Sequence, residues 1–186
     1  MTVSTTPSSS ATSYTPSAIT LHWIMALLIA AVFTAIELKD YYPKGSDTRA
    51  FLGSLHMMLG ITVLLLVVAR IAIRAQNRPP AIVPTPPAWQ TGLSHLVHLV
   101  LYAAMVGMPL LGWAMVSAGG HSVPFYGLSL PPILPEDKAL SHELEEIHEF
   151  IGNALYYVIG LHAAAALIHH YVFKDNTLVR MLRPGR

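Results

Sequence analysis

The sequence contains no cysteine, which excludes disulfide bonds, thiolate catalysis, c-type haem attachment and cysteine-ligated iron–sulfur clusters. It is also poor in charge, because only 11% of its residues are charged, against about 25% in a typical soluble domain. The net charge of +1 gives no indication of nucleic-acid binding, and no such partner is expected. The chain is instead rich in hydrophobic residues, at 53% of 186, which predicts an integral membrane protein.

Four hydrophobic segments are each long enough to cross a bilayer, which takes about 20 helical residues. We therefore expect an all-α fold, an integral membrane four-helix bundle, with spans at about 18–38, 49–74, 91–117 and 144–173. Residues 18–173 would form one transmembrane domain. Residues 1–17, rich in Ser, Thr and Pro and without charge, predict a disordered tail, and residues 174–186 a basic one.

The basic residues predict the orientation of this bundle. Four spans place both chain ends on the same side of the membrane. Residues 70–78 and the C-terminal tail hold seven Lys and Arg, whereas the loops on the opposite side hold four. The positive-inside rule then places both termini in the cytoplasm.

Histidines in the last span are the most informative feature, since ionisable side chains at membrane depth are costly and usually functional. His148 and His162 are 14 residues apart, so they lie within about 40° of one helix face and about 21 Å apart along the axis. His169, seven residues further on, stays near that face. Such a column suits two stacked metal cofactors inside a helix bundle.

Depth in the membrane sorts the histidines into two pairs. His22 and His162 lie toward the cytoplasmic side, and His56 and His148 lie near the outer ends of their spans. Each pair offers one imidazole for each face of a b-type haem, and ligation by two histidines suits electron transfer. Glycines near these histidines offer flat space for a macrocycle or, alternatively, ordinary small-residue helix contacts; they are Gly53, Gly60, Gly152 and Gly160.

Other histidines leave alternatives open. His95 and His98 lie at the inner depth, where they compete for ligation or bind a haem propionate. His169 is a candidate to hydrogen-bond a quinone carbonyl or relay a proton, whereas His170 points about 100° away and suits the interface. Zinc is the other candidate metal, since acids at 143–149 accompany the histidines, but no H-E-x-x-H spacing occurs. A metal transporter is the corresponding weaker hypothesis.

Motifs in all four spans carry a family resemblance. They are I-T-L-H-W at Ile19–Trp23, L-H-M-M-L-G-I at Leu55–Ile61, T-G-L-S-H-L-V-H-L-V at Thr91–Val100, I-H-E at Ile147–Glu149, and V-I-G-L-H-A-A-A-A-L-I-H-H-Y-V-F-K-D-N-T-L at Val158–Leu178. Through them the chain resembles the bacterial cytochrome b561 proteins, four-helix di-haem b membrane proteins, and in particular their superoxide oxidase branch. The resemblance covers about residues 18–183.

The resemblance implies a function and a set of sites. It implies inner haem ligands at His22 and His162, outer ligands at His56 and His148, and a quinone contact at His169. It also implies a bacterial inner-membrane oxidoreductase that takes electrons from periplasmic superoxide through two haems b and reduces ubiquinone. The alternative is a cytochrome b subunit, in contact with membrane lipid, that relays electrons from a periplasmic redox protein to the quinone pool.

Overall fold

The computed structural model describes residues 13–77 and 79–183 of the chain. These residues form four long helices, a two-stranded hairpin and a short 3-10 helix, namely α1 (Pro16–Lys39), α2 (Asp47–Gln76), α3 (Ala88–Ala118), β1 (Val123–Phe125), β2 (Leu128–Leu130), α4 (Lys138–Tyr171) and η1 (Val179–Met181). Each long helix is apolar enough to cross a membrane, and at 1.5 Å per residue they measure about 36 to 51 Å. The predicted all-α membrane bundle is confirmed.

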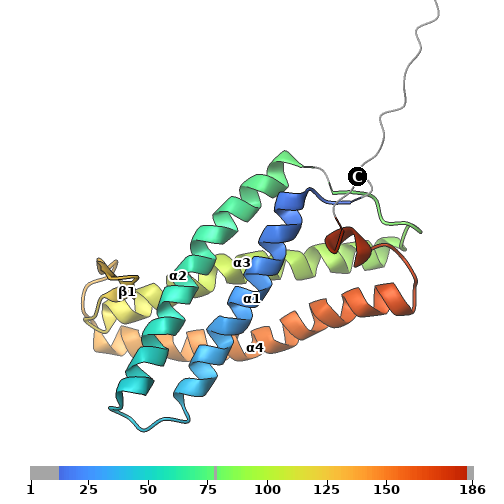
Figure 1. Cartoon of the computed structure of the whole chain (residues 1–186). Coiled ribbons are helices and arrows are strands. Elements are labelled where there is room, and N and C mark those ends of the chain that lie inside the picture. The colour runs from blue at the N-terminus through green and yellow to red at the C-terminus, as the bar shows by residue number, and fades with distance from the viewer. Residues whose placement is uncertain (1–12, 78, 184–186) are drawn as a thin grey trace, which may run out of the picture.

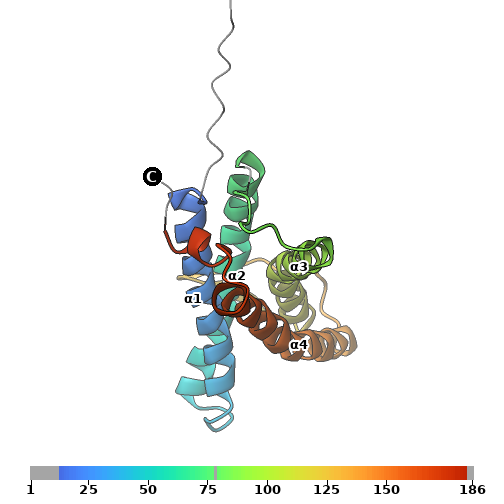
Figure 2. The same cartoon turned by 90° about the vertical axis from the view of Figure 1, so that its right-hand side faces the viewer.

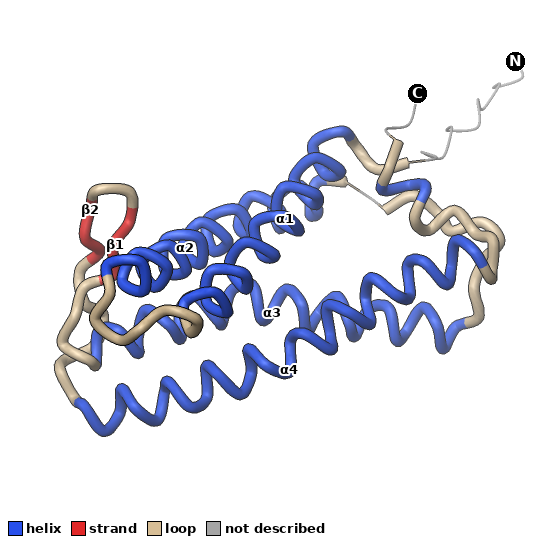
Figure 3. The backbone as a smooth tube through the Cα atoms, turned by 60° about the horizontal axis from the view of Figure 1, so that its bottom comes forward, coloured by secondary structure: helices blue, strands red, loops and turns tan. Residues whose placement is uncertain are grey.

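The four helices form two antiparallel pairs that cross each other (Figures 1 and 2). α1 packs along α2, α3 packs along α4, and α2 joins the two pairs by packing on α3. Both described chain ends lie at one end of the bundle, and the β-hairpin lies at the other (Figure 3). We call these the terminal end and the hairpin end.

Side-chain caps set the start of three helices. The side chain of Thr15 accepts a hydrogen bond from the backbone N–H of Ala18 at the start of α1. The side chain of Ser46 accepts one from the backbone N–H of Arg49 at the start of α2. Asp137 accepts from two backbone N–H groups at the start of α4. This last cap explains why α4 begins at Lys138, six residues before the expected span: the added turns are a polar extension of the helix.

The segment between α3 and α4 has more structure than a Gly/Pro-rich loop would suggest. β1 and β2 pair antiparallel, with Val123 opposite Leu130. The turn between them uses Tyr126 and Gly127, which both have positive φ, at 45° and 86°. Two consecutive positive φ angles are the geometry of a tight hairpin turn, and glycine is the residue that adopts it most readily.

The structure near the two chain ends differs from the predicted tails. Of the tail expected at residues 1–17, residues 1–12 lie outside the described residues, and Pro16 already belongs to α1. The C-terminal segment returns to the bundle after α4. There the indole N–H of Trp23 donates to the carbonyl of Met181 over 2.8 Å, and Asn176 is hydrogen-bonded to the backbone of Val83 in the connector between α2 and α3.

A small apolar core joins the first three helices. Met25, Val63 and Val67 are almost fully buried, and side chains of α3 such as Tyr102 and Met105 pack against them. Along α2, Val63 and Val67 lie between His56 at the hairpin end and Arg70 at the terminal end. This core therefore occupies the level between the two predicted pairs of histidines.

Candidate functional site

A cavity of about 690 Å³ runs between the two helix pairs and is lined by all four helices. That size lies within the range of small-molecule and cofactor sites. Its lining includes all four histidines predicted as ligands, His22, His56, His148 and His162, and also His98. Three of the glycines predicted to make room beside them also line it, Gly53, Gly60 and Gly152.

At the hairpin end, His56 of α2 faces His148 of α4. Their ring centres are 6.2 Å apart, and the ring planes are 74° apart. Nδ1 of His56 is 3.0 Å from the carbonyl oxygen of Val32, so it donates its proton there and leaves the Nε2 lone pair available. Nδ1 of His148 is buried and has no hydrogen-bond partner among the described residues.

A glycine of α3 lets His148 take this position. A Cβ atom built on Gly112 would lie only 3.2 Å from Cε1 of the His148 ring. Sequence reasoning did not single out Gly112, because it is far from any histidine along its own helix. Only the packing of α3 against α4 brings it beside the imidazole.

At the terminal end, His22 of α1 faces His162 of α4. Their ring centres are 6.3 Å apart, at an interplanar angle of 71°. Nδ1 of His22 lies 3.1 Å from Nη2 of Arg70. His98 of α3 also lies beside His162, with ring centres 5.2 Å apart, and its Nδ1 is hydrogen-bonded to the carbonyl of Ser94 over 2.6 Å.

These separations can be tested against a metal-centred group. With metal–nitrogen bonds of about 2.0 Å and roughly 1.1 Å from each nitrogen to its ring centre, two imidazoles on opposite sides of one metal ion would place their centres about 6.2 Å apart. The observed 6.3 Å for His22–His162 and 6.2 Å for His56–His148 fit this value. The 5.2 Å between His98 and His162 is too short. The residues present therefore fit two bis-histidine haems.

The arrangement of the side chains supports a zinc site less well than it supports two haem sites. Within residues 13–77 and 79–183, no three His, Cys, Asp or Glu side chains are grouped so as to hold a metal ion. His142 is exposed and pairs with Glu146 at 3.5 Å. Zinc prefers four ligands in a tetrahedral site, so the separate pairs of histidines match it poorly.

His169 lies outside the cavity, just before the C-terminal segment. Its Nδ1 donates to Oδ2 of Asp175 over 2.5 Å, and the Asp175 side chain is only 3% exposed. Burial alone would raise the pKa of the Asp175 carboxyl, but hydrogen bonds from His169 and from Thr177 outweigh burial and lower this pKa below its ordinary value. Asp175 thus stays ionised and orients the His169 ring through the hydrogen bond at Nδ1.

The remaining histidines lie apart from the cavity. His95, His121 and His170 are not among its lining residues, and His95 and His121 are exposed. The sequence motif did not identify Asp175 as a partner of His169, although both residues lie within it. The two residues are close in the sequence, but a separation of six residues does not by itself predict a contact. The contact forms only because the chain turns back after α4.

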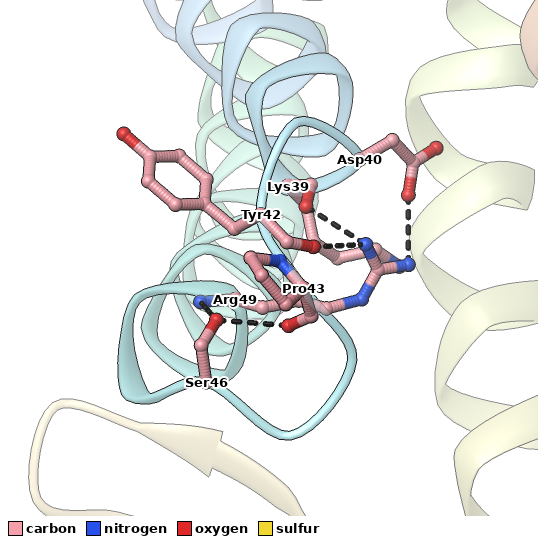
Figure 4. A network of polar contacts seen from close by, with 6 residues as sticks. All are labelled: Lys39, Asp40, Tyr42, Pro43, Ser46 and Arg49. Carbon is pink, nitrogen blue, oxygen red and sulfur yellow. Dashed lines mark hydrogen bonds and ion pairs between the residues drawn. The ribbon is translucent and has the colours of Figure 1, made fainter.

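Charged side chains gather where the cavity reaches the hairpin end. Arg49 spans the turn between α1 and α2, where its guanidinium donates to the carbonyls of Lys39 and Tyr42 and pairs with Asp40 at 2.9 Å (Figure 4). The hydroxyl of Tyr156 donates to Glu37 over 2.6 Å. The charged residues lining this part of the cavity are Glu37, Lys39, Asp40, Arg49, Glu145 and Glu149.

The fold and the cavity define a class, that of helical membrane proteins with facing pairs of histidines in a cavity between their helices. The family model for prokaryotic cytochrome b561 matches residues 13–184, and the chain belongs to this family. It is 40% identical over 162 residues to "Cytochrome b561 homolog 1" of Escherichia coli K12, covering 87% of this chain and 92% of that protein. It is 37% identical over 166 residues to the "Probable superoxide oxidase CybB" of Yersinia pestis, covering 89% and 93%.

A more distant relative is similar over almost its whole length. The chain is 28% identical over 177 residues to the "Cytochrome b562" of Cereibacter sphaeroides, covering 92% of this chain and 96% of that protein. Family membership makes the chain a multi-pass protein of the bacterial inner membrane that works in electron transport, and it implies haem b as the cofactor.

Proposed function

We propose that this chain holds two haems b, one between His22 and His162 and one between His56 and His148, and that it carries electrons across the membrane. The observation that carries the proposal is the pair of ring-centre separations, 6.3 and 6.2 Å, within one cavity. Bound haem b supplies one-electron transfer, and ligation on both faces suits this chemistry better than oxygen binding.

The protein prepares these positions through its own contacts. The bond from His56 to the Val32 carbonyl orients the imidazole and keeps Nε2 unprotonated, as ligation requires. Gly112 gives the His148 ring room to face it. The core around Met25, Val63 and Val67 provides apolar side chains at the level between the two pairs.

The proposed reaction joins superoxide oxidation to ubiquinone reduction. Two superoxide anions each lose one electron and become dioxygen, and ubiquinone gains two electrons and two protons to become ubiquinol. We place superoxide at the hairpin end, facing the periplasm, and ubiquinone at the terminal end beside His169. Support comes from the Yersinia pestis relative, which is named a probable superoxide oxidase and is 37% identical, and from the seven-to-four distribution of Lys and Arg.

Lys39 is the cation we propose to attract superoxide. Its aliphatic stem lies beside Gly53, with Cδ 3.7 Å from where a Cβ would be, and it lines the cavity at the hairpin end. The neighbouring guanidinium of Arg49 is already neutralised by Asp40. Three further acids line this mouth, so a single well-placed cation has to provide the local attraction for an anion.

The deciding experiment mixes the purified, oxidised, haem-loaded protein rapidly with superoxide while haem absorbance is followed. We expect fast reduction that superoxide dismutase abolishes, and re-oxidation when ubiquinone is added. Haems that stay oxidised in superoxide, yet accept electrons from dithionite and pass them to ubiquinone, would refute the superoxide step and leave an electron relay.

The relay is the second candidate function, and one observation favours it. The first turns of α4 expose four carboxylates at the hairpin end, Glu143, Glu145, Glu146 and Glu149. Such a surface attracts a basic redox protein, and its capture would depend steeply on salt. If this reading is right, a basic soluble cytochrome will reduce the haems at low ionic strength and superoxide will not.

A further inference from the structure

One arginine stands out because of where it lies in the membrane. Arg70 is 14 residues after His56 on α2, so it lies within about 40° of the same helix face and about 21 Å further along. Its side chain lines the cavity beside His22, with Nη2 3.1 Å from Nδ1 of that ring and the guanidinium 5.9 Å from the centre of the Tyr102 ring. A charge at this depth is costly and calls for a functional reason.

Charge is distributed unevenly along the cavity. Among the described residues that line it, Arg70 is the one formally charged side chain at the terminal end. The lining at the hairpin end instead holds four acids, Glu37, Asp40, Glu145 and Glu149, and two cations, Lys39 and Arg49. One end therefore carries a permanent positive charge, and the other a net negative one.

The contact between Arg70 and His22 cannot persist when His22 ligates a metal through Nε2. A guanidinium has only donors and keeps its protons, so Nδ1 of His22 must be the acceptor in the observed contact. Ligation through Nε2 moves the ring proton to Nδ1, which then has no lone pair to offer. In the haem-loaded protein the Arg70 guanidinium would thus be released from the ring, next to the site that His22 and His162 would form.

A fixed positive charge stabilises the electron-rich state of a nearby redox group, and it does so more strongly in a site of low dielectric constant than in water. We propose that Arg70 is a positioning residue that holds this charge at the terminal end and raises the midpoint potential of the haem there above that of the haem between His56 and His148. This rests on the proposed function. Electrons that enter at the hairpin end are then drawn inward, so the charge pattern sets the direction of flow.

The test is a spectroelectrochemical titration of haem-loaded protein in a His148→Ala background, where only the terminal-end haem is held. Arg70→Gln removes the charge and is expected to lower the midpoint potential, whereas Arg70→Lys keeps the charge and the potential. Arg74→Gln is the matched control, because Arg74 is one turn further along α2, lies over the Tyr14 ring at 5.8 Å and is not a cavity residue. It should leave the potential unchanged.

A second variant keeps the arginine. Tyr102→Glu places a carboxylate where the guanidinium now faces the ring, and neutralising the charge should lower the potential as well. If the potential stays at its original value in both Arg70→Gln and Tyr102→Glu, or falls equally in Arg70→Lys, the inference is wrong. If Arg70→Gln fails to retain haem, the titration of Tyr102→Glu decides alone. A His148→Ala protein that still holds both haems would instead refute the proposed ligands.

Discussion

Gly112 offers the sharpest test of the proposed hairpin-end site. In the structure, a methyl group at this position would approach Cε1 of His148 to 3.2 Å, closer than ordinary van der Waals contact. Without a cofactor, the His148 ring can move aside by a few tenths of an ångström. A ring that ligates a haem iron, as we propose for His148, would be held in place and could not move aside. Gly112→Ala should therefore weaken the haem-loaded state and leave the haem-free chain intact.

The size of the effect follows from the cost of overpacking. Forcing one extra methyl group into a packed site costs about 1–3 kcal/mol. At about 1.4 kcal/mol per factor of ten, haem should be held roughly 5- to 140-fold less tightly. The assay is haem transfer to excess apomyoglobin, in a His22→Ala background where only the hairpin-end haem remains.

Gly160→Ala is the matched control for this experiment. Gly160 is also a helical glycine, but nothing lies within 4 Å of the Cβ it would gain, and it does not line the cavity. Both substitutions bring the same helix propensity, about 1 kcal/mol in favour of alanine. Equal haem release from the two variants would show that His148 is not held against Gly112, and the site would need another arrangement.

Three further predictions address the other residues of the site. His22→Ala should remove the terminal-end haem, whereas His98→Ala should keep both haems, because the 5.2 Å between the ring centres of His98 and His162 is too short for a shared iron. Counting the haems per protein by the haemochrome assay checks both variants. Loss of a haem in His98→Ala would show that His98 is a ligand. His169→Ala and Asp175→Asn should leave the haem spectra unchanged but slow re-oxidation by ubiquinone, and normal re-oxidation in both would remove the quinone role. Lys39→Gln should slow reduction by superoxide at low salt, with the difference fading as ionic strength rises, and a salt-independent difference would argue against steering.

Much of the bundle was predictable because helices have a fixed period and bilayers a fixed thickness. The four hydrophobic segments predicted the four long helices. The 14-residue separation of His148 and His162 gave one face, and depth alone grouped His56 with His148 and His22 with His162. The structure brings these same pairs to 6.2 and 6.3 Å, while their role as ligands stays a prediction.

What could not be predicted depends on how the two helix pairs cross. Two contacts join residues of different helices, namely Gly112 with His148 and Arg70 with His22. The periodicity of one helix does not predict which residues of another helix will contact it. The hairpin turn was missed for a local reason, since Tyr126 adopts a positive φ that its residue type rarely takes. The Asp175–His169 bond likewise requires the chain to reverse after α4.

The use of α4 in both histidine pairs has a consequence for biogenesis. His148 and His162 each supply one half of a pair, and both lie on α4, which leaves the ribosome after the other three long helices of the described residues. A nascent chain with three inserted helices presents His22 and His56 without their facing rings. If these histidines are the haem ligands, as we propose, cofactor retention has to follow the insertion of α4, and ribosome-bound intermediates truncated before residue 138 should carry no haem. We therefore expect maturation to be a late event, timed by the insertion of α4.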